Sequence, residues 1–141
     1  MRRLLTLRRR LRLRRRRLRR RRLRLRRALL TPCGAGDKLN FPRKGSTVKV
    51  TYSGRLEGAE EGDNFDSSYN KKKKAQEPLV VKAGAGKLIA GWDAALLEMS
   101  VGEKAVLTIG PEGAYGAKGM PPKIPPNATL IFELELLAIM D

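Results

Sequence analysis

The sequence predicts an α+β fold in which one short helix packs its apolar face on a twisted antiparallel sheet. Residues 47–53, 104–109 and 129–139 have the two-residue alternation or the apolar, β-branched composition of strands. Residues 92–99 have the spacing of an amphipathic helix. The segments between them are rich in Gly, Pro and charged residues, which favours turns and short connections. Several short strands with a single helix are typical of α+β domains.

The formal net charge of +17 is distributed very unevenly along the 141 residues. Residues 1–30 contain 17 Arg, 10 Leu and no acidic residue, whereas residues 31–141 contain 14 basic and 14 acidic residues and are neutral. The second segment is long enough for one compact domain. We therefore predict a disordered Arg/Leu-rich extension over 1–30 and a single domain over 31–141, which opens with the Pro/Gly-rich linker 31–37.

Three interpretations of residues 1–30 remain open. Like charges at i,i+4 repel, so an isolated helix is disfavoured and the segment is expected to fold only on a polyanion. It is an arm that binds nucleic acid or directs nuclear import, an organellar transit peptide, or a repetitive untranslated stretch read as protein. Transit peptides are Arg-rich and acid-poor but normally Ser-rich, and this segment has no Ser. The corresponding localisation is nuclear or cytoplasmic, with organellar import as the alternative.

The domain begins with a strand in which Val48, Val50 and Tyr52 alternate with polar residues, and Gly54 is expected to end it. A turn-rich segment follows. Residues 78–84, "PLVVKAG", predict a second short strand.

The predicted helix carries Trp92, Ala95, Leu96 and Met99 at i, i+3, i+4 and i+7, so these side chains share one face. Gly102 stands where the helix is expected to have stopped.

Two further strands are predicted, over 104–109 and 129–139, separated by a Gly/Pro-rich loop that excludes regular structure. The last strand is the clearest of the chain, because four apolar residues face one side of it and two glutamates the other. The apolar residues are Leu130, Phe132, Leu134 and Leu136.

Several kinds of chemistry are excluded by composition. The absence of histidine removes Ser-His and Cys-His catalysis and His-ligated metals. Cys33 is the only cysteine, so no intramolecular disulfide forms, as in a reducing compartment. The segment "GAGK" at 84–87 lacks the spacing of a phosphate loop, and the aspartates lack that of a calcium loop. No apolar run is long enough to span a membrane. The sequence thus predicts no nucleophile, metal or cofactor.

Five apolar or aromatic residues lie in loops or at strand and helix ends: Tyr52, Phe65, Trp92, Tyr115 and Ile124. Each alone is most simply explained by core packing. Together, and in Gly/Pro-rich surroundings, they indicate an apolar pocket with few polar groups, as ligand sites have.

Five segments in order, "VTYSGRLE", "NFDSS", "LIAGWDAALLEMSVGEKAVLTI", "AYGAKG" and "IPPNATLIFELELL", resemble FKBP-type (tacrolimus- and rapamycin-binding) peptidyl-prolyl isomerases. The resemblance runs from about Lys38 to Met140. The "KKKKA" loop before "PL" resembles most the nuclear, rapamycin-preferring member of that family, whose separate N-terminal helical domain has no counterpart here.

The resemblance implies a curved antiparallel sheet, a half-barrel, wrapped around one short helix with an apolar pocket between them. It implies catalytic roles for Asp66, Tyr115 and Tyr52, with the Tyr115 hydroxyl and the Ile89 N–H donating hydrogen bonds to ligand carbonyls and Trp92 forming the floor. The implied ligand-binding positions are Phe65, Val81, Leu88, Ile89, Trp92, Ile124 and Phe132. Four positions depart from the family pattern and bear on affinity and sequence preference: Leu79, Ala90, Gly113 and Lys123.

The implied activity is isomerisation of X–Pro bonds, which assists protein folding and needs neither cofactor nor metal. The expected partners are X–Pro segments of proteins and macrolides such as rapamycin and tacrolimus, with a monomeric protein and no membrane. The alternative is a proline-binding or chaperone module that is tethered to nucleic acid by residues 1–30 and Lys71–Lys74.

Overall fold

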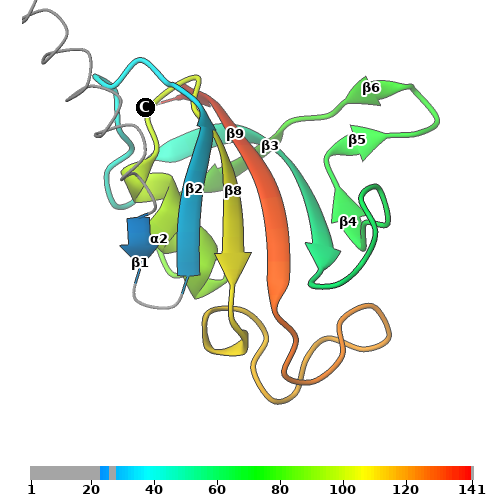
Figure 1. Ribbon diagram of the computed structural model, residues 1–141. Helices are drawn as coiled ribbons and strands as arrows, with labels where there is room; N and C mark the ends of the chain where they lie inside the picture. The colour runs from blue at the N-terminus through cyan, green and yellow to red at the C-terminus, as the bar shows by residue number, and fades with distance from the viewer. Residues whose placement is uncertain (1–22, 26–27, 141) are drawn as a thin grey trace, which may run out of the picture.

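The computed structural model describes residues 23–25 and 28–140. Its main element is a seven-stranded antiparallel sheet in the order β1-β2-β8-β9-β3-β4, with β7 also paired to β3 (Figure 1). A separate two-stranded sheet is formed by β5 and β6. The strands are β1 (Leu23–Leu25), β2 (Ala28–Gly34), β3 (Thr47–Leu56), β4 (Asp66–Ser67), β5 (Tyr69–Asn70), β6 (Ala75–Gln76), β7 (Leu79–Lys82), β8 (Lys104–Ile109) and β9 (Leu130–Ile139).

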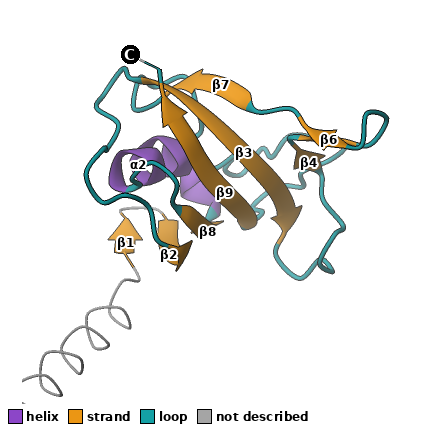
Figure 2. Cartoon of the chain, turned by 90° about the horizontal axis from the view of Figure 1, so that it is seen from above, coloured by secondary structure: helices purple, strands orange, loops and turns teal. Residues whose placement is uncertain are grey.

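The α-helix of the described residues, α2 (Ala90–Glu98), lies against one face of the curved sheet (Figure 2). The longest strands, β3 and β9, pair antiparallel from Val48↔Ile139 to Leu56↔Leu130 and form the centre of the sheet. Alternate residues of these strands are buried under the helix, as the two-residue period predicts. The predicted α+β class, with a curved sheet around a short helix, is confirmed.

The helix begins two residues before Trp92, and its predicted apolar face is buried: Trp92, Ala95, Leu96 and, at its end, Met99. Gly91 lets the helix approach the sheet closely. A Cβ there would lie 2.7 Å from the Ile109 Cδ1 atom, a distance that real Cβ contacts do not show. The helix is thus held tightly over β8.

The linker predicted over 31–37 is wrong, because most of it belongs to β2. This strand pairs with β8 from Ala28↔Ile109 onward, and Leu30, opposite Leu107, is fully buried. Pro32 is accommodated because, among the described residues, β1 pairs only with residues 28–30, so no described strand requires an N–H from the proline on that edge of β2. The domain boundary predicted after residue 30 therefore falls inside a strand, and the disorder predicted over 1–30 is wrong for 23–25 and 28–30. Residues 1–22 and 26–27 of that prediction lie outside the described residues.

Gly54 does not end its strand, since β3 continues to Leu56. A Cβ on Gly54 would lie 2.6 Å from Phe132 Cε1 and 3.0 Å from Phe65 Cζ, so the glycine lets two aromatic rings pack directly on the backbone. The loop between β8 and β9 is irregular as predicted, apart from a 3₁₀ turn at Pro111–Gly113 and a bridge between Met120 and Ile124. Within 23–25 and 28–140, no helix is both long and apolar enough to cross a membrane.

Candidate active site

A pocket of about 560 Å³ opens between the helix, the sheet and the loop that joins β8 to β9. This volume is in the range of small-molecule and peptide sites. Its lining brings together most of the site residues that the sequence predicts: Tyr52, Phe65, Asp66, Leu88, Ile89, Trp92, Tyr115 and Phe132. Leu79, Lys87, Met120 and Lys123 complete it.

Aromatic rings from three elements build the floor. Trp92, 5% exposed, meets Tyr52 of β3 edge-on with ring centroids 5.0 Å apart and Phe132 of β9 with centroids 5.2 Å apart. Phe65, just before β4, packs edge-on against Phe132 at 5.7 Å. Because edge-to-face packing fixes each ring against the next, the floor is apolar and rigid.

Asp66 and Tyr52 form the principal polar pair of the pocket. The Tyr52 hydroxyl donates to Asp66 Oδ2 at 2.9 Å, and the Ser67 N–H donates to Asp66 Oδ1 at 2.8 Å. Burial, and then the hydrogen bond to Asp66, raise the pKa of Tyr52 to about 12. The phenol is therefore protonated at physiological pH, and both carboxylate oxygens of Asp66 already accept a hydrogen bond.

The loop before the helix is fixed by the first helical turn. Asp93 accepts hydrogen bonds from the N–H groups of Gly84, at 2.9 Å, and Gly86, at 3.1 Å. The carbonyl of Ile89 accepts the N–H of Trp92 at 3.0 Å. The Ile89 N–H itself has no partner among the described residues, so it is free to donate to a ligand carbonyl.

Tyr115 enters the pocket from the β8–β9 loop. Its carbonyl accepts the N–H of Gly119 at 3.1 Å, and the N–H of the next residue, Gly116, donates to Pro111 at 2.8 Å. The Tyr115 hydroxyl makes no hydrogen bond with any residue of the described part of the chain. The pocket therefore holds the two donors that the sequence predicts for ligand carbonyls, the Ile89 N–H and the Tyr115 hydroxyl.

Two predicted site residues do not line the pocket. Ile124 is 1% exposed and belongs to the core, and Val81, paired with Val48, packs half-buried against that core. Lys87 and Met120 line the pocket but were not predicted, since exposed loop residues have no period to place them.

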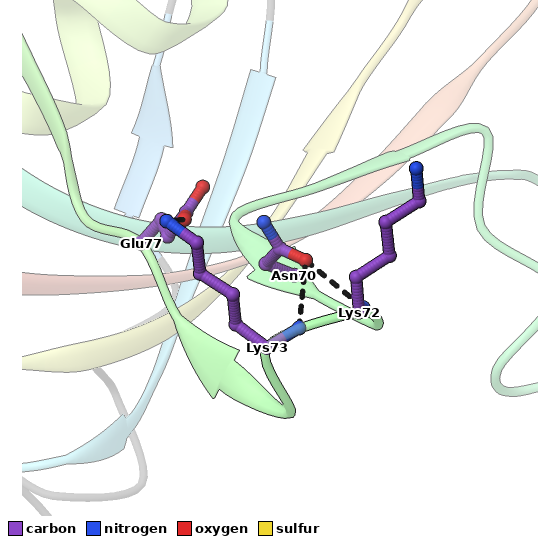
Figure 3. A network of polar contacts seen from close by, with 4 residues as sticks. All are labelled: Asn70, Lys72, Lys73 and Glu77. Atoms are coloured by element: carbon purple, nitrogen blue, oxygen red, sulfur yellow. Dashed lines mark hydrogen bonds and ion pairs between the residues drawn. The ribbon is translucent and has the colours of Figure 1, made fainter.

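The lysine-rich loop Lys71–Lys74 joins β5 to β6 and projects from the body of the sheet (Figure 1). Asn70 Oδ1 accepts the backbone N–H groups of Lys72 and Lys73, and Lys73 Nζ lies 3.0 Å from Glu77 Oε1 (Figure 3). This ion pair is the main reason why the pKa of Glu77 is lowered. The other three ammonium groups make no ion pair with a described residue, which leaves a cationic hairpin tip.

Comparison with known proteins gives a consistent result. The family described as FKBP-type peptidyl-prolyl cis-trans isomerase matches residues 38–137. The chain is 50% identical over 104 residues to FK506-binding protein 1A of Aspergillus fumigatus, covering 74% of this chain and 87% of the relative. It is 45% identical over 107 residues to a peptidyl-prolyl cis-trans isomerase of Schizosaccharomyces pombe, covering 76% and 89%. The crystal structure of a peptidyl-prolyl cis-trans isomerase from Pseudomonas syringae superimposes with a TM-score of 0.68 at 32% identity, covering 81% and 76%.

Proposed function

The chain belongs to the FKBP-type peptidyl-prolyl cis-trans isomerase family, and on that premise we propose that the aromatic pocket around Trp92 is where it isomerises X–Pro bonds. The protein is a peptidyl-prolyl cis-trans isomerase. The observation that supports this site is the joining of an apolar aromatic floor with two hydrogen-bond donors that have no partner in the described residues, the Ile89 N–H and the Tyr115 hydroxyl.

Rotation about an X–Pro bond breaks amide resonance, against a barrier of roughly 18–20 kcal/mol, and is slow without a catalyst. No bond to another atom forms or breaks, so the site needs no nucleophile. The planar amide is more dipolar than the twisted one. An apolar floor therefore disfavours the ground state more than the transition state, which is differential binding.

The polar groups of the pocket orient the substrate. The Ile89 N–H and the Tyr115 hydroxyl are available to donate hydrogen bonds to carbonyls of the bound peptide, and such bonds would hold the peptide while the X–Pro bond turns. Asp66 is held by Tyr52 and Ser67, so it forms a fixed carboxylate wall at the rim. Each of these groups lowers the barrier only by helping to position the peptide. Because several groups do this together, the loss of one should reduce the rate without abolishing it.

The test is protease-free exchange NMR of a Leu-Pro peptide with the full chain. Phe65→Ala, on the pocket wall, is expected to lower kcat/KM about twofold to tenfold, since an aromatic contact contributes about 0.5–1.5 kcal/mol. Tyr69→Ala is the matched control, because Tyr69 is an exposed aromatic outside the pocket lining. Equal losses of kcat/KM in the two variants would show that the active site lies elsewhere.

The same pocket is proposed to bind the macrolides tacrolimus and rapamycin. Relatives at 50% identity carry the name FK506-binding protein, and the floor residues Tyr52, Trp92 and Phe132 are present. Trp92 is the only tryptophan, so filling the pocket should change the fluorescence of the protein. An unchanged spectrum at saturating macrolide, with isomerase activity intact, would refute macrolide binding.

We propose that the protein is nuclear or cytoplasmic and acts as a monomer. We also propose that it binds nucleic acid through residues 1–30 and Lys71–Lys74. Support comes from the 17 arginines of the extension and from the unpaired ammonium groups of the hairpin tip. The affinity for RNA or DNA should fall steeply as the salt concentration rises. For duplex DNA, the slope of the logarithm of the binding constant against the logarithm of the salt concentration is about −0.9 per neutralised phosphate. A fluorescent fusion of the full chain tests the localisation, and import into an organelle would contradict it. Analytical ultracentrifugation tests the monomeric state, and a dimer mass would contradict it.

A further inference from the structure

The mouth of the pocket carries an excess of positive charge. Its lining includes three charged side chains, of which two are lysines, Lys87 and Lys123, and one is a carboxylate, Asp66. Lys87 comes from the loop before α2 and Lys123 from the β8–β9 loop, so the two cations stand on separate walls. Both side chains are exposed.

The one carboxylate of the lining does not neutralise these lysines. Asp66 accepts the Tyr52 hydroxyl and the Ser67 N–H, and neither Lys87 nor Lys123 forms an ion pair with it. Within the described part of the chain, the two lysines have no anionic partner at all. Two ammonium groups at the edge of an apolar pocket are thus available to an anion that a bound peptide brings with it.

Both lysines are attached to fixed backbone. Lys87 follows Gly86, whose N–H is held by Asp93 at 3.1 Å. Lys123 precedes Ile124, which is buried and paired with Met120 by hydrogen bonds in both directions, at 2.8 and 3.0 Å. The ammonium groups therefore sample positions around the rim rather than moving with a loose loop.

From this arrangement we propose that the isomerase selects X–Pro sites with an anionic side chain, a carboxylate or a phosphate, within a residue or two of the proline, and that Lys87 and Lys123 determine this preference. The proposal rests on the pocket being the isomerase site. A proline ring on the aromatic floor leaves the neighbouring residues at the rim, where an anion meets unpaired ammonium groups and an uncharged side chain gains nothing from them. Exposed ion pairs are weak, so the preference is modest, about 1.5- to 5-fold for each lysine.

The experiment compares matched peptides with the full chain by exchange NMR, each peptide normalised to its own uncatalysed rate. Glu-Pro is paired with Gln-Pro, and phosphoserine-Pro with Ser-Pro. We expect the Glu:Gln ratio of kcat/KM to be about threefold in the unmodified chain and to approach one in the double variant Lys87→Gln/Lys123→Gln. A larger ratio for the phosphoserine pair identifies phosphate as the preferred anion, and a larger ratio for the glutamate pair identifies carboxylate.

The arginines of residues 1–30 attract any anionic peptide, so a control variant must separate that effect from the rim. Lys118→Gln serves, because Lys118 is exposed in the same β8–β9 loop but does not line the pocket. It should keep the ratio of the unmodified chain. A ratio of one in the unmodified chain, or an equal fall in the Lys118 and double variants, overturns the proposal. No acceleration of Gln-Pro or Ser-Pro peptides by a folded chain would instead overturn the active-site assignment itself.

Discussion

Replacing Trp92 by alanine should reduce the free energy of unfolding by about 3–5 kcal/mol, the usual cost of truncating a buried tryptophan. The indole is 5% exposed and packs edge-on against Tyr52 and Phe132. The substitution removes both aromatic contacts and leaves a cavity between helix and sheet. Because the same ring forms the pocket floor, isomerase activity should fall with stability.

Trp92→Phe separates the shape of the ring from its polar atom. The indole Nε1 is buried and has no hydrogen-bond partner among the described residues. A buried unpaired donor costs about 1–3 kcal/mol, and phenylalanine removes that cost while it keeps much of the apolar volume. The two effects oppose each other, so we expect a net loss of only about 0–2 kcal/mol.

The assay is urea unfolding followed by circular dichroism, since both variants lack the only tryptophan. A shift in midpoint at constant slope measures the change in stability. Tyr69→Ala, at an exposed aromatic, is the control and should stay within about 0.5 kcal/mol of the parent. A loss below about 1.5 kcal/mol in Trp92→Ala would show that the ring is not core. Equal losses in the alanine and phenylalanine variants would show that the indole N–H has a partner.

Four further predictions concern polar groups of the site and of the loop before the helix. Tyr115→Phe should lower kcat/KM about tenfold or less without abolishing it, since orientation is shared, and exchange NMR measures this. The pKa of Tyr52 is raised to about 12, so its contribution to stability is complete below pH 10 and is lost as pH rises towards 12; alkaline unfolding of Tyr52→Phe should lack that component. Asp66→Asn should lower the pKa of Tyr52 but leave it above 10, because burial is the larger cause, and ultraviolet titration checks this. Asp93→Ala removes the acceptor for two loop N–H groups and should destabilise the fold by about 1–3 kcal/mol, as urea unfolding would show.

The sheet and the helix could be predicted because periodicity records which side of an element is buried. In β9 the four apolar residues that alternate from Leu130 to Leu136 are all buried, as their spacing requires. The same reasoning failed at Gly54, which was expected to end its strand, because sequence alone does not distinguish a glycine inside a strand from one at its end. The structure explains this glycine by the close approach of Phe65 and Phe132, which both lie outside β3.

The pocket could not be predicted from local patterns alone. Tyr52, Asp66, Trp92 and Tyr115 meet only through the pairing of β3 with β4, the placement of α2 on the sheet and the course of the β8–β9 loop. The types of these residues indicated an apolar pocket. The five motifs in their order indicated the family in which these residues share one site. Local periodicity did not identify Lys87, because an exposed lysine in a loop looks the same whether or not it borders a site.

Strand β2 was missed for a different reason, and a truncation series tests that reason. Leu29 and Leu30 share the Arg/Leu composition of the extension, but a free edge of β8 pairs with them and buries Leu30 completely.

A chain that lacks residues 1–22 loses none of the residues that form the described sheet and should keep the parent's stability. A chain that lacks 1–30 loses β1, the first three pairs of β2 with β8 and a buried leucine, which alone contributes about 1.5–3 kcal/mol. Leu30→Ala in the full chain separates burial from chain length and should cost about 2–5 kcal/mol. If removal of 1–30 leaves urea unfolding unchanged relative to removal of 1–22, residues 28–30 of β2 contribute nothing to stability, and the domain begins after residue 30 as its composition predicts.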